Sequence, residues 1–263
     1  SVVKTAEICK KAKLDAIVIV GGPHATDWTE ICFQSPYIDF CVSGEGEESI
    51  LSLLEAIKNN LTYFQQIPGV SSKKNGQVNI RKSIPYISDL DRYPYPARDL
   101  LLHQDKYTSE DMGVIMTSRG CPYRCGFCSH PPKVRYRNLD NVIKEIKYVK
   151  EKCGTQQFAI KDDSFTVNRK RTVAFCKMLI KEGLDINWDC TTRVNLIDEE
   201  LLDIMQTAGC NTVKVGIETG SERILKEVNK GVTFEQMKKA ANMLNKRGMF
   251  WSAYFMYGLP TET

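Results

Sequence analysis

Three cysteines within one short stretch constrain this chain more than any other feature. Cys121, Cys125 and Cys128 stand in TSRGCPYRCGFC (residues 117–128), a CxxxCxxC spacing. Thiolates are soft ligands for iron and zinc, so three of them on one tight loop predict a metal site. A structural zinc site normally completes its tetrahedron with a fourth Cys or His. Three clustered thiols without an evident fourth ligand therefore favour a site that keeps one position open for a substrate.

His130 is the nearest residue that would give a different site. Together with the three thiols it would make a Cys3His zinc site, and the chain would then be a zinc-stabilised binding module. Such sites usually take their ligands as two separated pairs, which this loop does not offer. The zinc module stays open as the alternative to an enzyme.

The remaining cysteines do not predict a disulfide framework. Such frameworks belong to small secreted domains, whereas this chain has 263 residues and no basic-then-apolar leader. We expect the other seven to be reduced core residues, with Cys190 on a strand whose end faces the site. They are Cys9, Cys32, Cys41, Cys153, Cys176, Cys190 and Cys210.

Charge and hydropathy exclude some partners. Lys and Arg total 36 against 32 acidic residues, a net charge of +4, which argues for neither nucleic acid nor a membrane surface as partner. No run of about 18 apolar residues predicts a membrane span. We expect a cytoplasmic protein. Ser1 lies inside an amphipathic pattern and Thr263 follows a Gly-Leu-Pro turn, so we expect an interior fragment of a longer chain.

The cysteine loop resembles the signature of the radical S-adenosylmethionine (radical SAM) enzymes. Phe127 stands directly before the last cysteine, and the apolar stretch GVIM (113–116) precedes the loop. The resemblance implies a 4Fe-4S cluster on Cys121, Cys125 and Cys128, with SAM on the fourth iron. One electron then splits SAM into methionine and a 5'-deoxyadenosyl radical, so an electron donor such as a flavodoxin or ferredoxin is implied. Three thiols leave one iron open, which agrees with this chemistry.

Residues 1–60 alternate helices and apolar strands in the pattern of a doubly wound sheet. Apolar runs at 16–20 and 38–42 each end in a glycine-rich turn, and helices are predicted at 1–13, 29–33 and 49–58. Ligands of such sheets bind outside the carboxyl ends of the strands. His24, beside a proline turn, is expected at the surface rather than on a metal.

The strings IVIVGGPHAT and DFCVSGEGEESILSLLEAI are similar to the second half of the cobalamin-binding domain of the B12-binding radical SAM subgroup. The resemblance implies that both turns border the nucleotide tail of the corrinoid. A cobalt-ligating DxHxxG motif would lie in earlier strands, which are not in this chain. The implied cobalamin contacts are Gly21, Gly22, Gly44 and Gly46.

Residues 61–112 are predicted to be a linker with a β-hairpin. Asn75-Gly76 between the runs 67–72 and 77–80 is a strong hairpin signal, and the proline-rich stretch 89–100 must be extended before each proline. This stretch resembles the linker of the same subgroup.

Residues 113–263 repeat strand and helix regularly, which predicts a parallel sheet of the barrel type. The resemblance implies a core of six βα units, and the chain ends after the fifth strand. The predicted fold is therefore α/β: the C-terminal half of a doubly wound, Rossmann-like cobalamin-binding domain, then an incomplete (β/α)6-type partial TIM barrel that lacks its last strand. The predicted strands are 113–117, 157–161, 187–191, 212–217 and 250–256, and the helices 141–153, 170–182, 198–208, 221–228 and 234–247.

Active-site residues of such sheets lie at the carboxyl ends of the strands. Asp162, Arg193 and Glu218 are charged groups that emerge there from apolar strands, whereas Ser221 is expected to be only a helix N-cap. DDSF, TTRVN, GIETGSERIL and FMYGLP resemble the subgroup's strand ends and imply SAM contacts, with Arg193 on the methionyl carboxylate. The implied SAM shell is Phe127, Asp162, Asp163, Arg193, Gly216, Glu218, Met256 and Gly258.

These features together predict an enzyme. The resemblance implies a cobalamin-associated radical SAM protein that removes hydrogen from an unreactive carbon of a small-molecule substrate and then methylates or rearranges the product. A radical SAM enzyme without a corrinoid is the second alternative, beside the zinc module. No residue is singled out as catalytic, and nothing in the sequence identifies the substrate.

Overall fold

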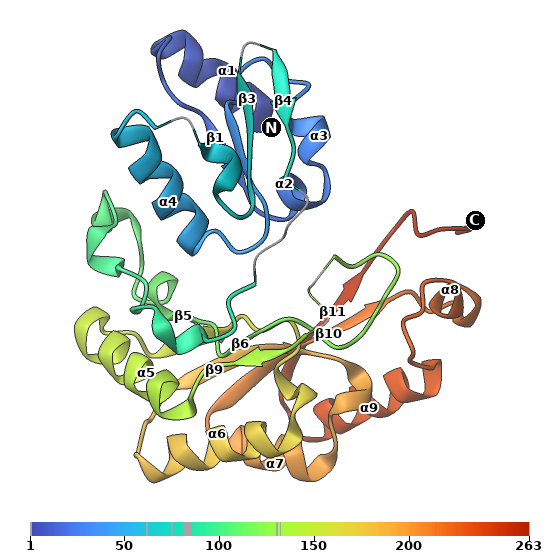
Figure 1. Cartoon of the computed structure of the whole chain (residues 1–263). Helices are drawn as coiled ribbons and strands as arrows, with labels where there is room; N and C mark the ends of the chain where they lie inside the picture. The colour runs from blue at the N-terminus through green and yellow to red at the C-terminus, as the bar shows by residue number, and fades with distance from the viewer. Residues whose placement is uncertain are drawn as a thin grey trace. The chain divides into compact units, whose positions relative to one another are not determined.

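The computed structural model describes residues 2–61, 63–74, 76–81, 86–129, 131 and 133–262. It divides the chain into two compact units, Ser1–Ser88 and Asp89–Thr263 (Figure 1). The predicted linker 61–112 is split at this boundary. Its hairpin belongs to the first unit, and its proline-rich half belongs to the second.

The first unit contains a four-stranded mixed sheet in the order β1-β2-β3-β4. Strands β1 (Ile19–Gly21) and β2 (Phe40–Val42) are parallel, as the doubly wound pattern predicts. Strands β3 (Val70–Lys74) and β4 (Gln77–Asn79) form the predicted hairpin, and β3 pairs antiparallel with β2. The hairpin therefore extends the sheet instead of standing apart from it. Asn75, at its tip, lies outside the described residues.

The described residues of the first unit form four α-helices: α1 (Val2–Ala12), α2 (Pro23–Asp27), α3 (Thr29–Cys32) and α4 (Glu47–Lys58). Helix α2 was not expected, because Gly-Pro reads as a turn. Proline suits the first position of a helix, where its missing N–H would have no partner. Buried side chains form two separate small clusters, one around Ala25 and Ile38 and one around Phe40 and Leu53.

The second unit contains a five-stranded sheet in the order β11-β10-β9-β8-β5, in which all neighbours are parallel. The sheet is open, since β5 and β11 form its two edges among the described residues, as predicted. Its strands are β5 (Val114–Ile115), β8 (Gln157–Ile160), β9 (Asn187–Thr192), β10 (Cys210–Glu218) and β11 (Phe250–Phe255).

The first strand is shorter than predicted, because the chain leaves the sheet after Ile115. Residues 118–119 form β6 (Ser118–Arg119), which pairs antiparallel with β7 (Arg135–Tyr136). This two-stranded ribbon carries the cysteine loop between its strands. Its strands are only two residues long, so no periodic pattern in the sequence marks them.

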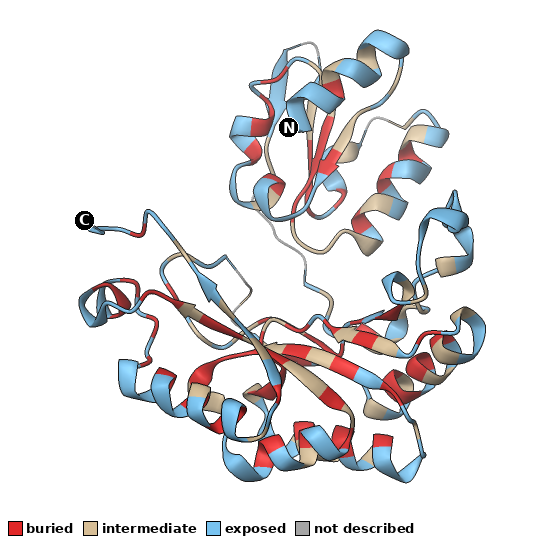
Figure 2. Cartoon of the chain, turned by 180° about the vertical axis from the view of Figure 1, so that it is seen from behind, coloured by how far each residue is buried: buried red, intermediate tan, exposed pale blue. Residues whose placement is uncertain are grey.

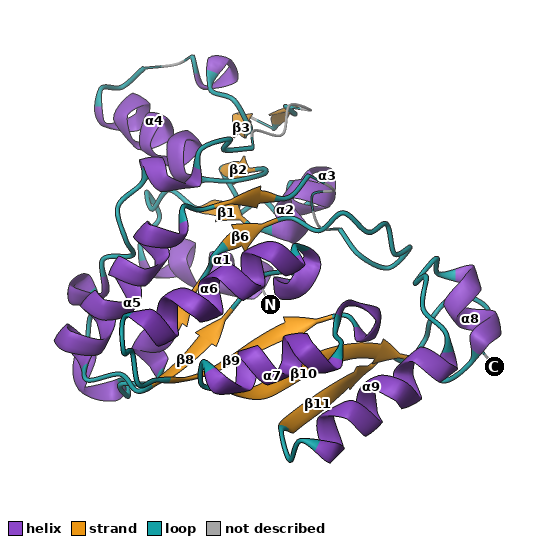
Figure 3. Cartoon of the chain, turned by 90° about the horizontal axis from the view of Figure 1, so that it is seen from below, coloured by secondary structure: helices purple, strands orange, loops and turns teal. Residues whose placement is uncertain are grey.

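Helices α5, α6, α7 and α9 cover one face of the five-stranded sheet (Figures 1 and 3). Most helices of this unit begin with a side chain that accepts a first-turn N–H, as Asn138, Asp198 and Ser221 do. The expected cap at Ser221 is thereby confirmed. The helices are α5 (Leu139–Cys153), α6 (Arg169–Lys181), α7 (Glu199–Thr207), α8 (Glu222–Glu227) and α9 (Phe234–Lys246).

One continuous core lies between this sheet and its helices (Figure 2). Phe165, Phe175 and Trp188 form an edge-to-face triangle with ring centroids 5.4–5.6 Å apart, a favoured aromatic geometry. Burial raises the pKa of Cys176 to about 12.

The core-cysteine prediction is confirmed for Cys32, Cys41, Cys176, Cys190 and Cys210, which are buried. It is wrong for Cys9, which lies on the exposed face of α1, and Cys153 is only half-buried at the end of α5. Within the described ranges, none of the helices has the length and apolar character needed to cross a bilayer.

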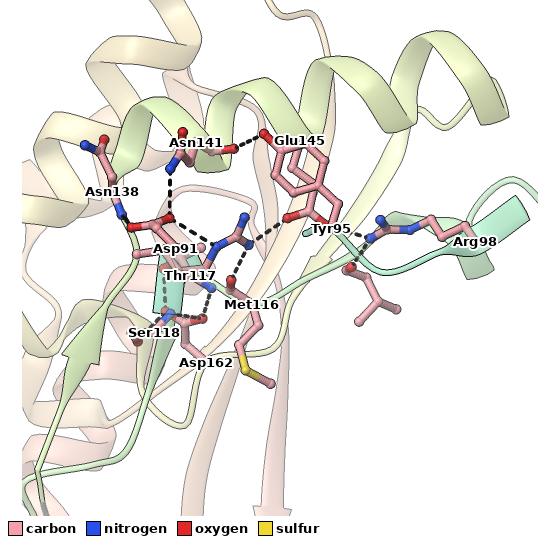
Figure 4. Close-up of polar contacts among 12 residues, drawn as sticks. Asp91, Tyr95, Arg98, Met116, Thr117, Ser118, Asn138, Asn141, Glu145 and Asp162 are labelled. Atoms are coloured by element: carbon pink, nitrogen blue, oxygen red, sulfur yellow. Dashed lines mark hydrogen bonds and ion pairs between the residues drawn. The ribbon is translucent and has the colours of Figure 1, made fainter. Parts of the chain in front are cut away.

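The proline-rich segment is tied to the second unit by buried ion pairs (Figure 4). The Glu145 carboxylate, 1% exposed, accepts from Nη2 of Arg98 at 3.0 Å and from Nη1 of Arg137 at 2.6 Å. Arg98 also donates to the carbonyl oxygen of Val114, and Arg137 to that of Met116. The two guanidinium groups thus satisfy carbonyls along and just beyond edge strand β5, which would otherwise be open to pairing with another chain.

Candidate active site

The cysteine loop begins with a turn that only glycine fits. Gly120 has φ 92°, and a Cβ there would lie 2.4 Å from the carbonyl oxygen of Lys133. The Cys121 N–H donates to the carbonyl of Pro131 at 2.9 Å, and the Cys128 N–H to that of Cys125 at 3.0 Å. Backbone contacts therefore fold the loop back on itself.

The three thiols differ in exposure. Cys125 is buried, Cys121 is half-buried and Cys128 is exposed, and burial raises the pKa of Cys121 above its usual value. No three His, Cys, Asp or Glu side chains among the described residues converge on a point where a metal ion would sit. The structure thus gathers the thiols on one loop but not around one point. His130, on which the zinc alternative depends, lies outside the described residues.

A second loop holds the cysteine loop from the far end of the sheet. The Gly126 N–H donates to the carbonyl of Val228 at 2.7 Å, and Nδ2 of Asn229 donates to the carbonyl of Arg124 at 3.1 Å. Asn229 has φ 51°, a left-handed conformation that asparagine tolerates. The turn after α8 therefore fixes the middle of the cysteine loop.

Arg193, at the end of β9, lies against the same part of the loop. It is 5% exposed, and its Nη1 donates to Sγ of Cys125 at 3.4 Å. Its Nη2 donates to the carbonyl of Lys230, and its guanidinium stacks 3.8 Å from the ring centroid of Tyr123. A buried cation that donates to a sulfur suits a thiolate, so this donor set fits an iron-sulfur cluster.

A buried ion pair lies at the end of β10. Nζ of Lys230 lies 2.8 Å from Oε1 of Glu218, and these residues are 5% and 8% exposed. The register shifts between Gly216 and Glu218, and Glu218 has φ 64°, a bulge that redirects its side chain. A Cβ on Gly216 would lie 2.4 Å from that carboxylate, so glycine leaves the room. Nζ of Lys230 also lies 5.7 Å from the Phe127 ring centroid.

Lys230, Asn229 and Tyr123 were missed from the sequence. The string Asn-Lys-Gly after an amphipathic run indicates a helix C-terminus. Nothing in that pattern marks the lysine as buried, because lysine is almost never fully buried unless it is paired. Its partner, Glu218, stands on another element, so the pair appears only in the fold.

Asp162 has a different environment from the one predicted (Figure 4). Its carboxylate is 4% exposed and accepts from the N–H groups of Thr117 and Ser118, at 2.6 and 3.0 Å, and from both hydroxyls, each at 2.6 Å. Burial raises its pKa, while the hydrogen bonds from Ser118 and Thr117 act in the opposite direction. These bonds join the end of β8 to the start of the cysteine loop.

Asp163 lies at the next position and also contacts the loop. Its Oδ2 accepts from the Gly120 N–H at 2.7 Å. Met256, after β11, donates its N–H to the Glu218 carbonyl at 2.9 Å and packs with Phe127 against Leu259. Gly258 has φ 76° and is exposed. The structure thus brings Phe127, Glu218 and Met256 together, with Gly258 two residues further on.

In the first unit, one side chain joins the two glycine turns. Oγ1 of Thr26 donates to the carbonyl of Gly22 at 3.0 Å and accepts from the Gly44 N–H at 2.9 Å. Gly22 and Gly44 have φ 94° and 79°, which favour glycine, whereas a Cβ on Gly21 or Gly46 would make ordinary contacts. His24 lies exposed on α2, as predicted.

A parallel α/β sheet that carries a three-cysteine loop after its first strand defines a class of enzyme that binds an iron-sulfur cluster beside the carboxyl ends of its strands. The model of the Radical SAM superfamily matches residues 115–263. The chain therefore belongs to the Radical SAM superfamily.

Two curated relatives extend the similarity to the first unit. An uncharacterized methyltransferase of Pyrococcus horikoshii is 37% identical over 265 residues, 98% of this chain and 57% of the relative. An anaerobic magnesium-protoporphyrin IX monomethyl ester cyclase of Rubrivivax gelatinosus is 32% identical over 273 residues, 99% of this chain and 49% of the relative. The chain spans about half the length of these relatives.

A solved structure shares the fold over the whole chain. It is the radical S-adenosylmethionine methyltransferase TsrM of Kitasatospora setae with cobalamin and a 4Fe-4S cluster bound. The TM-score is 0.78 at 20% identity, covering 100% of this chain and 54% of that protein. At this identity the likeness shows a common fold.

Proposed function

We propose that the full-length protein is a cobalamin-dependent radical SAM enzyme that methylates an unreactive carbon of a small-molecule substrate. The observation that carries this is the arrangement around Cys125. A loop of three thiols meets a buried cation and a buried ion pair where the strands end. The methyltransferase name of the 37% identical relative supports methylation as the outcome, with rearrangement as the alternative.

The cluster would be held by Cys121, Cys125 and Cys128. When bound, a cluster with three protein thiolates supplies an electron and an open iron position for SAM. The chain's own part is to hold the loop. Asp162 and Asp163 secure its first half, and the turn after α8 secures its second half. We infer that Asp162 positions the loop and does not contact SAM, because four hydrogen bonds within the chain already engage its carboxylate.

The SAM shell would comprise Phe127, Gly216, Glu218, Met256 and Gly258. Phe127 and Met256 pack on one apolar cluster that suits a nucleobase. Glu218 and Lys230 lie beside it and present opposite charges, which match the ammonium and carboxylate of an amino acid. Asp163 lies just beyond the end of β8, which is separated from β10 by β9.

Cobalamin would lie at the glycine turns of the first unit. Gly22 and Gly44 leave backbone without side chains at the carboxyl ends of two parallel strands, where a nucleotide tail can approach closely. The relation to TsrM, solved with cobalamin, supports this choice. The electron donor would be a flavodoxin or ferredoxin.

The test uses full-length protein reconstituted anaerobically with iron and sulfide. We expect iron and sulfide in 4Fe-4S proportion, a bound corrinoid, and release of 5'-deoxyadenosine when SAM and a chemical reductant are added. One zinc per chain and no iron would replace the proposal with the zinc module. Iron and SAM cleavage without corrinoid binding would leave a radical SAM enzyme that lacks cobalamin.

A further inference from the structure

Arg193 is engaged in a way that does not suit the role first predicted for it. Each of its three side-chain nitrogens already faces an acceptor in the chain. Nη1 donates to Sγ of Cys125 at 3.4 Å, Nη2 donates to the carbonyl of Lys230, and Nε lies 3.4 Å from Oδ1 of Asn195. One guanidinium face lies against Tyr123. A bidentate grip on a carboxylate needs two free N–H groups on one edge. The edge that contains Nε is not free for such a grip, and each Nη already has one N–H group engaged within the chain.

The partners of Arg193 belong to different parts of the second unit. Tyr123 and Cys125 belong to the cysteine loop, and Lys230 belongs to the turn that holds this loop. The guanidinium therefore joins the end of β9, the cysteine loop and the turn after α8. It is 5% exposed, so water screens its charge weakly.

Cys125 is the most buried of the three thiols and the one that Arg193 contacts. A hydrogen bond from a cation to a ligand sulfur draws negative charge off that sulfur. Such bonds stabilise the more negative, reduced state of a cluster and raise its reduction potential. Neighbouring Lys230 forms an ion pair with Glu218. Among the described residues, Arg193 is therefore the cation that contacts this sulfur without a carboxylate partner of its own.

We propose that Arg193 is a positioning residue that holds the Cys125 thiolate and raises the reduction potential of the cluster, and that it does not bind the carboxylate of SAM. This inference rests on the proposed function, because it needs a cluster on the three cysteines.

The experiment is a redox titration of anaerobically reconstituted full-length protein without SAM, followed by electron paramagnetic resonance. At a poise where half of the wild-type cluster is reduced, we expect Arg193→Gln to lower the ratio of reduced to oxidised cluster about tenfold with iron content retained. Arg193→Lys keeps the charge and should recover part of the ratio. Arg169→Gln removes an exposed arginine of α6 and should match the wild type.

SAM affinity is measured on the same samples and separates the two roles. An unchanged ratio with weakened SAM binding in Arg193→Gln would overturn the inference and return Arg193 to the SAM carboxylate. An unchanged ratio with unchanged SAM binding would also overturn it. If wild type takes up no cluster, the proposed function fails and this inference falls with it.

A second variant covers the case in which Arg193→Gln loses its iron. Tyr123→Leu removes the ring that backs the guanidinium, so the guanidinium is held less firmly against Sγ of Cys125. It should lower the reduced-to-oxidised ratio in the same direction by a smaller factor. A ratio equal to that of wild type in this variant would overturn the inference.

Discussion

The two units end their parallel strands in different ways. In the first unit, three-residue strands end in glycine turns whose glycines 21 and 22 are exposed and whose inter-turn contacts come from a threonine hydroxyl. In the second unit, the longer strands β9 and β10 end in the buried charged groups Arg193 and Glu218, each held by partners on other elements. The first unit therefore offers backbone to a ligand, and the second offers fixed side chains. This difference suits a cofactor tail in the first unit and redox chemistry in the second.

The cores differ in the same sense. The first unit buries two small separate clusters, whereas the second has a large continuous core around the aromatic triangle, beside a small cluster at Leu259. A continuous core can hold charged groups rigidly at its edge, because close packing fixes the positions of the strands and helices that carry them. We expect changes to the glycine turns to leave the second unit folded.

The largest effect is expected at the cysteine loop. Cys125→Ala removes one of three thiolates from a site that has no fourth, so reconstituted iron should be lost. Cys176→Ala is the matched control, since this buried cysteine of α6 lies in the core and contacts no part of the loop that is described here. Iron and sulfide analysis checks both variants. Equal iron content in the two variants would show that Cys125 is not a ligand of the cluster.

The next largest effect is expected at the glycine turns of the first unit, and it tests whether their exposed backbone holds the corrinoid. Gly22→Val with Gly44→Val forces two residues into left-handed angles, and Gly22, with φ 94° and ψ −174°, lies in a region essentially confined to glycine. We expect roughly 2–4 kcal/mol of strain and loss of corrinoid from the full-length protein, with iron retained.

The control for that pair changes the other two glycines. Gly21→Ala with Gly46→Ala places methyl groups where only ordinary contacts arise, so corrinoid should be kept. Corrinoid content by absorbance after anaerobic purification gives the answer. Retention in the valine pair would show that these turns do not hold the corrinoid.

Much of this architecture could be predicted from the sequence, because apolar periodicity and glycine turns are local signals. The parallel strands, their helices and the cysteine loop all followed from such signals. The ribbon of β6 and β7 did not, because two-residue strands have no period. The environment of Asp162 did not either, since two adjacent acids at a strand end look alike until the fold buries one among hydroxyls. The Lys230–Glu218 pair joins positions on different elements, and only the tertiary fold creates it.

A smaller effect is expected at Asp162. Asp162→Ala leaves two N–H groups and two hydroxyls without their acceptor, which should lower the free energy of unfolding by about 1–3 kcal/mol. Asp162→Asn should recover most of this, because the hydroxyls of Thr117 and Ser118 can turn to accept from the amide. Denaturant unfolding and SAM titration are the measurements. Weakened SAM binding by Asp162→Asn at wild-type stability would return this residue to the SAM shell.

The smallest effect is the pH dependence of stability that a buried thiol gives to each of the two units. Burial raises the pKa of Cys41 in the first unit and of Cys176 in the second, each to about 12, and neighbouring Cys32 adds to the shift of Cys41. In the unfolded chain both thiols ionise with the ordinary cysteine pKa of 9.0. Each therefore contributes stability that is complete below about pH 9 and is lost as pH rises toward 12.

As the pH rises from 9 to 10, each thiol should lower the free energy of unfolding of its unit by about 1 kcal/mol. Cys176→Ala should flatten this decline for the second unit only, and Cys41→Ala for the first only, even though each variant starts from a lower stability at pH 8. Urea unfolding at pH 8, 9 and 10, followed by tryptophan fluorescence, measures the slopes. Trp28 lies in the first unit, and Trp188 and Trp251 lie in the second. Replacing Trp28 therefore leaves the signal of the second unit, and replacing Trp188 and Trp251 together leaves that of the first. If Cys176→Ala flattened both slopes equally, the two units would unfold as one body, and the contrast between their cores would not extend to their stability.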